Sequence, residues 1–230
     1  MQSRKPFNIA IDGPAGAGKS TIAKMVAKKL GFIYVDTGAM YRAMALYFIR
    51  QGIGAEDEAA VGAACKEIEI TIRYQDGVQQ VILNGEDVSG LIRTEEVGNM
   101  ASATSVYPVV RAHLLELQRS LAASADVLMD GRDIGTCILP DADAKIFLTA
   151  STGVRAMRRY KELEEKGETC NLKEIEQDII ERDQRDMNRE TAPLRQAEDA
   201  VLIDSSEMTV AEVIDAIIEA AKSRGLEAGQ

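Results

Sequence analysis

Short apolar stretches alternate with longer amphipathic ones along most of this 230-residue chain. The short stretches, which predict buried β-strands, are residues 7–12, 32–36, 127–130, 145–149 and 201–204. The longer stretches, which space apolar residues three and four apart and so predict helices, are residues 19–30, 39–51, 95–122, 152–165, 172–188 and 210–223. This alternation is typical of an α/β fold, so we expect a five-stranded parallel sheet flanked by helices.

Residues 68–84 depart from this pattern. Apolar and polar side chains alternate there with a period of two on both sides of Asp76-Gly77. A period of two is typical of strands, and Asp-Gly is a common hairpin turn. We therefore expect a small antiparallel β element inserted into the α/β core.

The first predicted strand leads directly into Gly13-Pro14-Ala15-Gly16-Ala17-Gly18-Lys19-Ser20-Thr21, a match to G-x-x-x-x-G-K-[ST]. Glycines let successive backbone amides point at one phosphate, and the N-terminus of the following helix adds positive charge. A chance glycine-rich turn is the alternative, but Lys19 beside an apolar strand has no evident packing role. We expect this loop to bind ATP, with Lys19 at the β and γ phosphates and the Ser20 hydroxyl on Mg²⁺.

Composition narrows the partners. The net charge of −10 argues against a broad nucleic-acid-binding face, so we expect no nucleic-acid polymer as a ligand. No stretch approaches 18 consecutive apolar residues, which argues against a membrane protein. Three scattered cysteines suit a reduced compartment, and we expect a cytoplasmic protein. The single histidine, His113, excludes a multi-histidine metal site.

Two predicted strands end in polar residues that could serve the same site. Asp36 and Thr37 begin a helix that carries Arg42 one turn later, and ligands of open α/β sheets bind at the carboxyl ends of the strands. A simple helix N-cap at Asp36 or Thr37, with Arg42 in solvent, is an equally good interpretation.

The third strand ends at Asp130, followed by Gly131 and the pair Arg132 and Asp133. Asp130 stands where a Walker-B carboxylate acts on Mg²⁺, directly or through water. Arg132 and Asp133 could instead form a surface ion pair of little energetic value. Because two strand ends point to one crevice, we favour a site.

Arginines are concentrated in residues 151–195. Arg182, Arg185, Asp186 and Arg189 share one helical face by spacing, and the preceding helix carries Arg155, Arg158 and Arg159. A solvated face with ion pairs is the alternative. Phosphoryl transfer spreads negative charge over the equatorial oxygens of the transferring group, and this charge must be neutralised. We therefore favour a helical lid whose arginines close over the phosphates.

A phosphate loop does not by itself separate kinases from other nucleotide-binding proteins. No Asn in the chain precedes a Lys, which removes the Asn-Lys-x-Asp guanine-reading motif of GTPases. The phosphate loop, Asp36 to Arg42, Gly85 to Ser89, Ile92 to Val97, Asp130 to Thr136 and Glu181 to Asp186 together closely resemble the bacterial cytidylate kinases, in the nucleoside monophosphate kinase group of P-loop kinases.

The resemblance implies three regions. They are a P-loop core at residues 1–36, 104–150 and 196–230, a monophosphate-binding region at residues 37–103 with the β insertion near 68–84, and a helical lid at residues 151–195. It also implies a CMP site in which Thr37, Arg42, Arg132 and Arg189 hold the acceptor phosphate. Arg182 and Asp186 would then contact the ribose, and Ser102, Arg111 and Asp133 the cytosine.

The activity implied is transfer of the terminal phosphoryl group of ATP to CMP or dCMP, giving ADP and CDP or dCDP. We expect Lys19, Arg132, Arg189, Arg155 and Arg159 to act on the transferring group, Ser20 and Asp130 to hold Mg²⁺, and the protein to be a monomer. Two alternatives stay open at this point: a P-loop kinase for another acceptor, such as UMP, AMP or a small alcohol, and a nucleotide-dependent switch without transfer activity.

Overall fold

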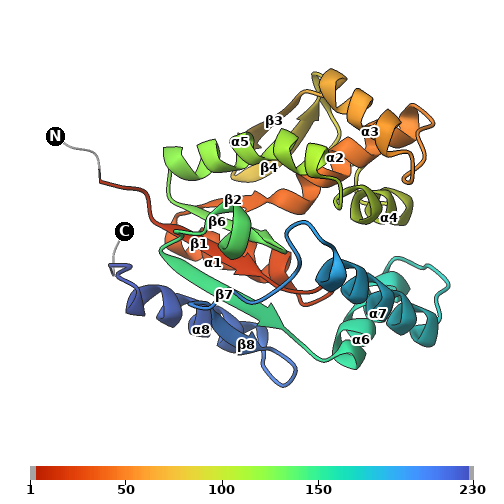
Figure 1. Ribbon diagram of the computed structural model, residues 1–230. Helices are drawn as coiled ribbons and strands as arrows, with labels where there is room; N and C mark the ends of the chain where they lie inside the picture. Colours follow the sequence, from red (N-terminus) through yellow and green to blue (C-terminus); the bar gives the residue numbers. More distant parts are fainter. Residues whose placement is uncertain (1–3, 228–230) are drawn as a thin grey trace. The chain divides into compact units, whose positions relative to one another are not determined.

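The computed structural model describes residues 4–227 and consists of two compact units (Figure 1). The first unit comprises Met1–Tyr34 and Asp126–Gln230, and the second comprises Val35–Ala125. The second unit is therefore an insertion into the first along the sequence.

A five-stranded parallel sheet organises the fold, which confirms the α/β prediction. Its strands are β1 (Asn8–Asp12), β2 (Ile33–Asp36), β6 (Val127–Gly131), β7 (Ala144–Thr149) and β8 (Val201–Asp204), in the order β2-β6-β1-β7-β8. β1 lies between β6 and β7, and its last residue, Asp12, is opposite Gly131 and Phe147. The ends of these central strands therefore carry the segments that contain the predicted phosphate loop and Arg132.

Helices α1 (Lys19–Leu30) and α8 (Val210–Ser223) pack together against the sheet of the first unit. Ile22 and Val26 of α1 and Ile217 of α8 are buried in one hydrophobic cluster with the strands. α1 ends at Gly31, which adopts the left-handed conformation that glycine tolerates. Apolar burial on one face of each helix thus fixes α1, and with it the loop that precedes it.

Helices α6 (Thr152–Glu165) and α7 (Leu172–Asn188) pack against each other in the same unit. Each begins with a side-chain cap, since Ser151 accepts a hydrogen bond from Val154 N and Asn171 accepts one from Lys173 N. Both helices have the bounds that the sequence pattern predicts. They are the two helices of the expected arginine-bearing lid.

The second unit contains α2 (Thr37–Arg50), α3 (Glu58–Ala64), α4 (Glu95–Thr104), α5 (Pro108–Ser124) and a three-stranded antiparallel sheet. That sheet is formed by β3 (Ile70–Gln75), β4 (Val78–Leu83) and β5 (Glu86–Asp87). The β3–β4 turn is Asp76-Gly77, with φ of 52° and 76°, the left-handed conformations of a tight hairpin turn. The hairpin prediction is confirmed.

The helix predicted over residues 95–122 is wrong as a single element. The chain forms α4 and α5 instead, and α5 begins at Pro108. Proline has no amide hydrogen and disfavours a helical residue before it, so it suits the first turn of a new helix. The pattern also missed α3 and the π-helical turn Ile134–Ile138, which are too short to show a clear period.

The compact units do not coincide with the expected functional regions, because residues 104–125 lie in the second unit. The boundaries of a core, a monophosphate-binding region and a lid stay a prediction. None of the helices within residues 4–227 has both the length and the apolar character that crossing a membrane requires.

Candidate active site

The phosphate loop between β1 and α1 depends on its glycines. Gly13, Gly16 and Gly18 have φ of 152°, 74° and 84°, a region that other residues rarely adopt. A Cβ atom on Gly13 would lie 1.9 Å from the carbonyl oxygen of Leu148 on β7, so no side chain fits there. The loop is therefore held close against the sheet.

Lys19, the first residue of α1, is buried, and its Nζ donates a hydrogen bond to the carbonyl oxygen of Pro14 at 2.8 Å. Burial, and after it the positive charge of Arg132, lowers the pKa of this amine well below its usual 10.5. A negatively charged group bound in the loop would oppose both effects and favour the protonated amine. Lys19 is therefore placed to bind phosphate.

Asp130, near the end of β6, has both carboxylate oxygens hydrogen-bonded. The Ser20 hydroxyl lies 2.8 Å from Oδ2, and the Tyr34 hydroxyl lies 2.9 Å from Oδ1. Mg²⁺ prefers oxygen ligands and usually takes one or two from the protein, with the rest from water and substrate phosphates. Ser20 and Asp130 fit that requirement, and in residues 4–227 no cluster of three or more His, Cys, Asp or Glu side chains offers another metal site.

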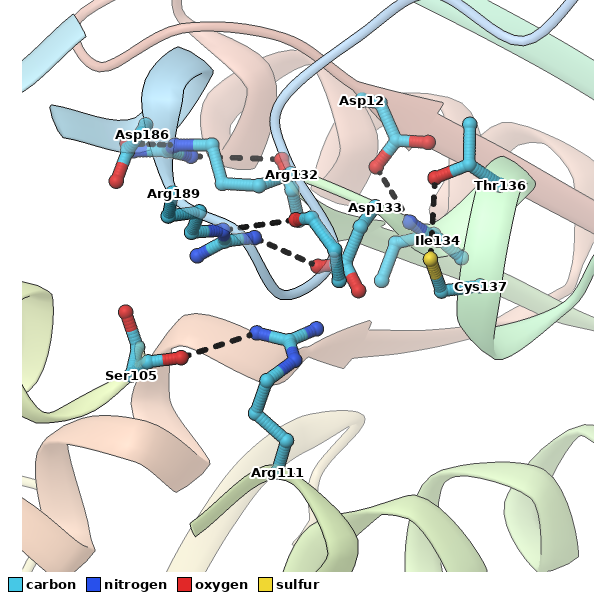
Figure 2. Close-up of polar contacts among 12 residues, drawn as sticks. Asp12, Ser105, Arg111, Arg132, Asp133, Ile134, Thr136, Cys137, Asp186 and Arg189 are labelled. Atoms are coloured by element: carbon cyan, nitrogen blue, oxygen red, sulfur yellow. Dashed lines mark hydrogen bonds and ion pairs between the residues drawn. The ribbon is translucent and has the colours of Figure 1, made fainter. Parts of the chain in front are cut away.

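Two ion pairs connect the segment after β6 to the end of α7 (Figure 2). Arg132 Nε lies 2.9 Å from Asp186 Oδ2, and Arg189 Nη2 lies 3.3 Å from Asp133 Oδ1. Burial raises the pKa of Asp186, but the charge and hydrogen bond of Arg132, with further positive charge nearby, outweigh it and hold that pKa below its usual 3.8. Arginines and carboxylates far apart in sequence therefore form one buried charged cluster.

Arg155 of α6 is buried, and its guanidinium bonds several other residues of the first unit. It donates to the carbonyl oxygens of Ala150 and Ala15, both at 2.9 Å, and its Nη2 lies 2.6 Å from Asp183 Oδ2 of α7. Arg158 likewise donates to the carbonyl oxygen of Ser205. α6 is thereby attached to the phosphate loop through the loop's own backbone.

Asp12, at the end of β1, is buried and accepts two backbone hydrogen bonds, each of 2.7 Å, from the amides of Ile134 and Gly135. Burial raises the pKa of this carboxyl from 3.8 to about 7, although the two amides oppose the rise. The residue before the phosphate loop is thus bonded to the segment that follows Arg132 and Asp133.

The second unit carries the remaining residues of the predicted CMP site. Thr37 is buried at the start of α2, where Asp36 is the N-cap and accepts a hydrogen bond from Ala39 N. Ser102 of α4 is also buried. Arg111 of α5 donates to the carbonyl oxygen of Ser105 at 3.4 Å, and its guanidinium lies 5.7 Å from the centre of the Tyr41 ring.

Within the first unit, Ser20 of the phosphate loop bonds Asp130, and Arg132 bonds Asp186. The positive charge of Arg132 also helps to lower the pKa of Lys19. Arg159 stands apart, since it pairs with Glu162 of its own helix at 3.1 Å. Arg185, predicted on the same helical face as Asp186, is exposed.

Sequence reasoning missed Asp12, Tyr34 and Asp183. Asp183 lies three residues before Asp186 on α7, so helical spacing could have placed both on one buried face. Tyr34 and Phe32 fit the alternating pattern of a strand, so nothing in the sequence indicated a polar contact for the Tyr34 hydroxyl. Asp12 looked like the ordinary end of an apolar strand.

A glycine-rich phosphate loop on a parallel sheet, with an adjoining cluster of arginines, defines the class of P-loop kinases. A solved structure of an uncharacterized protein from Eubacterium ventriosum ATCC 27560 shares this fold, with a TM-score of 0.54 at 13% identity over 94% of this chain and 99% of that one. Residues 9–223 match the model of the cytidylate kinase family. The chain belongs to that family.

Two relatives support the same assignment. The cytidylate kinase of Alkaliphilus metalliredigens is 52% identical over 92% of this chain and 92% of its own. The cytidylate kinase of Geobacter sp. (strain M21) is 48% identical over 94% of this chain and 93% of its own. Similarity at this level covers both compact units.

Proposed function

We propose that this cytidylate kinase transfers the γ-phosphoryl group of ATP directly to the phosphate of CMP or dCMP, with the charged groups of the first unit as its transfer machinery. The observation that carries the proposal is a pair of contacts: Ser20 of the phosphate loop lies 2.8 Å from Asp130, and Arg132, two residues further on, lies 2.9 Å from Asp186. They join the loop that binds the donor to the residues assigned to the acceptor. The products are ADP and CDP or dCDP.

On the donor side, the loop at residues 13–21 binds the phosphates of ATP through its backbone amides, Pro14 excepted because proline has no N–H. Lys19 exchanges its hydrogen bond to Pro14 for the β and γ phosphates. Ser20 and Asp130 hold Mg²⁺, directly or through water, and Tyr34 fixes the orientation of the Asp130 carboxylate. The bound ion supplies neutralisation of the charge that develops on the phosphate oxygens.

On the acceptor side, Arg132 and Arg189 hold the phosphate of CMP, and family resemblance assigns Thr37 and Arg42 to the same phosphate. The attacking oxygen belongs to a group that is already ionised at neutral pH, so no general base is needed. Catalysis then consists of positioning and of neutralising charge on the transferring group. Arg132 and Arg189 are held in place before the ligand binds, because Asp186 pairs with Arg132 and Asp133 pairs with Arg189.

The nucleoside is assigned by family resemblance. Arg182 and Asp186 contact the ribose, and Ser102, Arg111 and Asp133 contact the cytosine. Arg155 and Arg159 are the lid arginines proposed to reach the transferring phosphoryl group. Arg155 can do so only by giving up its bonds to Ala15 and Asp183, so we propose that its first role is to hold α6 to the phosphate loop.

A coupled assay of ADP formation tests the function. CMP, dCMP, UMP and AMP are each offered with MgATP, and we expect kcat/KM to be highest with CMP and dCMP. Faster turnover with another acceptor would assign a different kinase, and ATP binding with no acceptor-dependent ADP would indicate a switch. We also propose a monomer, which sedimentation at assay concentration checks.

A further inference from the structure

Asp12 connects two segments whose relative position matters for the reaction, the phosphate loop and the segment after β6. It is the last residue of the central strand β1, and the phosphate loop begins at the next residue, Gly13. Its carboxylate is bonded to the amide of Ile134 (Figure 2) and to the amide of Gly135, and these two residues follow Arg132 and Asp133. One side chain therefore joins the donor loop to the segment assigned to the acceptor.

The peptide unit between Asp133 and Ile134 is held at both ends. Its N–H, which belongs to Ile134, donates to Asp12 Oδ1 at 2.7 Å. Its carbonyl oxygen, which belongs to Asp133, accepts from Cys137 N at 2.9 Å and Ile138 N at 3.2 Å. The orientation of this peptide sets the directions in which the Asp133 side chain and, one residue earlier, the Arg132 side chain project.

The carboxylate is enclosed by the protein. A Cβ atom on Gly135 would meet Lys145 Cδ at 3.1 Å, which is tighter than a usual contact, and Asp12 Oδ2 at 3.4 Å, which is an ordinary van der Waals contact. Asp12 is 4% exposed, and both of its bonds end on amides that would otherwise lack a partner at the start of the turn Ile134–Ile138. Above its pKa of about 7, the Asp12 carboxylate is ionised and can accept both bonds, whereas an asparagine side chain can accept only one and presents a donor to the other amide. The two side chains are therefore compared at pH 8.

We infer that Asp12 is a positioning residue for the acceptor side of the reaction. It holds the Asp133–Ile134 peptide so that Arg132 and Asp133 meet Asp186 and Arg189 at the distances that the acceptor phosphate and base require. It acts through these residues and does not touch either substrate. This inference rests on the proposed function, because it presumes that CMP is bound by Arg132 and Asp133.

The test compares Asp12→Asn with a matched control, Asp143→Asn. Asp143 also accepts a backbone hydrogen bond on β1, from Asn8 N at 2.8 Å, but at the opposite end of the strand. We expect Asp12→Asn to lower kcat/KM for CMP by about 10- to 100-fold, the cost of a small misplacement of reacting groups. Affinity for a non-hydrolysable ATP analogue should stay at the wild-type value, and Asp143→Asn should change neither quantity.

Amide hydrogen exchange measured by NMR supplies a second readout. In Asp12→Asn the amides of Ile134 and Gly135 should exchange faster than in the wild type, while those of residues 15–20 keep their rates. Equal losses in ATP and CMP binding would assign Asp12 to the phosphate loop and overturn the inference, as would unchanged kinetics. If Asp12→Asn does not fold, Asp12→Ser, which removes the charge and leaves space, is measured in the same way.

The outcomes separate the two proposals. A wild-type protein that forms no ADP in response to CMP overturns the proposed function itself. A wild-type protein that does so, together with an Asp12→Asn variant that is unimpaired or impaired equally toward both substrates, overturns only the role of Asp12.

Discussion

Buried charged residues around the phosphate loop take their partners from the protein. Lys19 bonds the carbonyl of Pro14, Asp12 bonds two amides and Arg155 bonds the carbonyl of Ala15. A buried charge without a partner is costly, so each of these groups must be satisfied before a ligand arrives. In the proposed mechanism, Lys19 exchanges the carbonyl oxygen of Pro14 for phosphate oxygens when ATP binds.

Replacing Lys19 by Met tests the most directly placed of these groups. The variant loses the ammonium that we propose to bind the β and γ phosphates, and removal of one such electrostatic donor costs about 2.7–4 kcal/mol, or roughly 10²- to 10³-fold in kcat. Steady-state kinetics with saturating CMP measure the loss. Lys28→Met, on the exposed face of the same helix, is the control and should turn over normally. Near-normal turnover by Lys19→Met would contradict the mechanism.

Asp12 predicts a pH dependence of stability. Its pKa is about 7 in the folded protein, against 3.8 for an ordinary Asp, so the folded state holds the proton more tightly. Its contribution is fully present below the unfolded pKa and is lost as pH rises through the folded pKa. Relative to Asp12→Asn, the free energy of unfolding of the wild type should therefore fall by about 4 kcal/mol between pH 4 and pH 8. Urea unfolding at several pH values measures it, and a constant difference would contradict the assignment.

At the scale of elements, α6 illustrates how burial decides what an ion pair contributes. Arg155 and Asp183 are almost fully buried and lie 2.6 Å apart, whereas Arg159 and Glu162 are exposed and lie 3.1 Å apart. The first pair joins α6 to α7 and, through Ala15, to the phosphate loop. The second pair stays on the surface of one helix.

Asp183→Asn and Glu162→Gln make a matched comparison. Removing Asp183 leaves the Arg155 charge buried without its partner, so we expect a loss of stability on the order of 3–5 kcal/mol. Removing Glu162 should cost less than about 1 kcal/mol, because the pair is exposed to solvent. Denaturant unfolding of both variants measures the difference. Similar losses would show that the buried pair does not hold the two helices.

At the scale of the whole molecule, charge is distributed unevenly. The chain carries a net charge of −10, yet arginines are concentrated at Arg132, along α6 and α7, and at Arg189. An acidic exterior repels anions in general, so the phosphate ligands depend on local positive charge. Recognition of CMP should therefore be sensitive to ionic strength.

Raising the ionic strength from about 0.05 to 0.5 M shortens the Debye length and should weaken CMP binding on the order of tenfold. Cytidine, which lacks the phosphate, is the control, and its weaker affinity should hardly change with salt. Isothermal titration calorimetry at several salt concentrations measures both. An affinity for CMP that is flat across this range would contradict a guanidinium clamp on the phosphate.

Strong local patterns were sufficient to predict most of the elements. The phosphate loop, the Asp76-Gly77 hairpin and helices α6, α7 and α8 follow from the sequence, because each has a clear period, cap or turn residue. The break at Pro108 was missed, since apolar periodicity continues on both sides of it. For the site, the phosphate-loop motif pointed to Ser20, and residue types next to a strand end pointed to Asp130 and Arg132, whose polar contacts the structure then placed in the first unit.

The sequence by itself determined the class of fold and the loop that meets phosphate, since both arise from residues that are neighbours along the chain. Only the tertiary structure decided which polar and charged groups meet. Asp12 bonds the amides after Asp133, Arg155 pairs with Asp183, and Arg189 pairs with Asp133. These partners lie on different elements, and packing of the sheet and helices sets their distances. A carboxylate at a strand end is the same residue in the sequence whether it is buried or exposed, but its burial and its partners determine its chemistry.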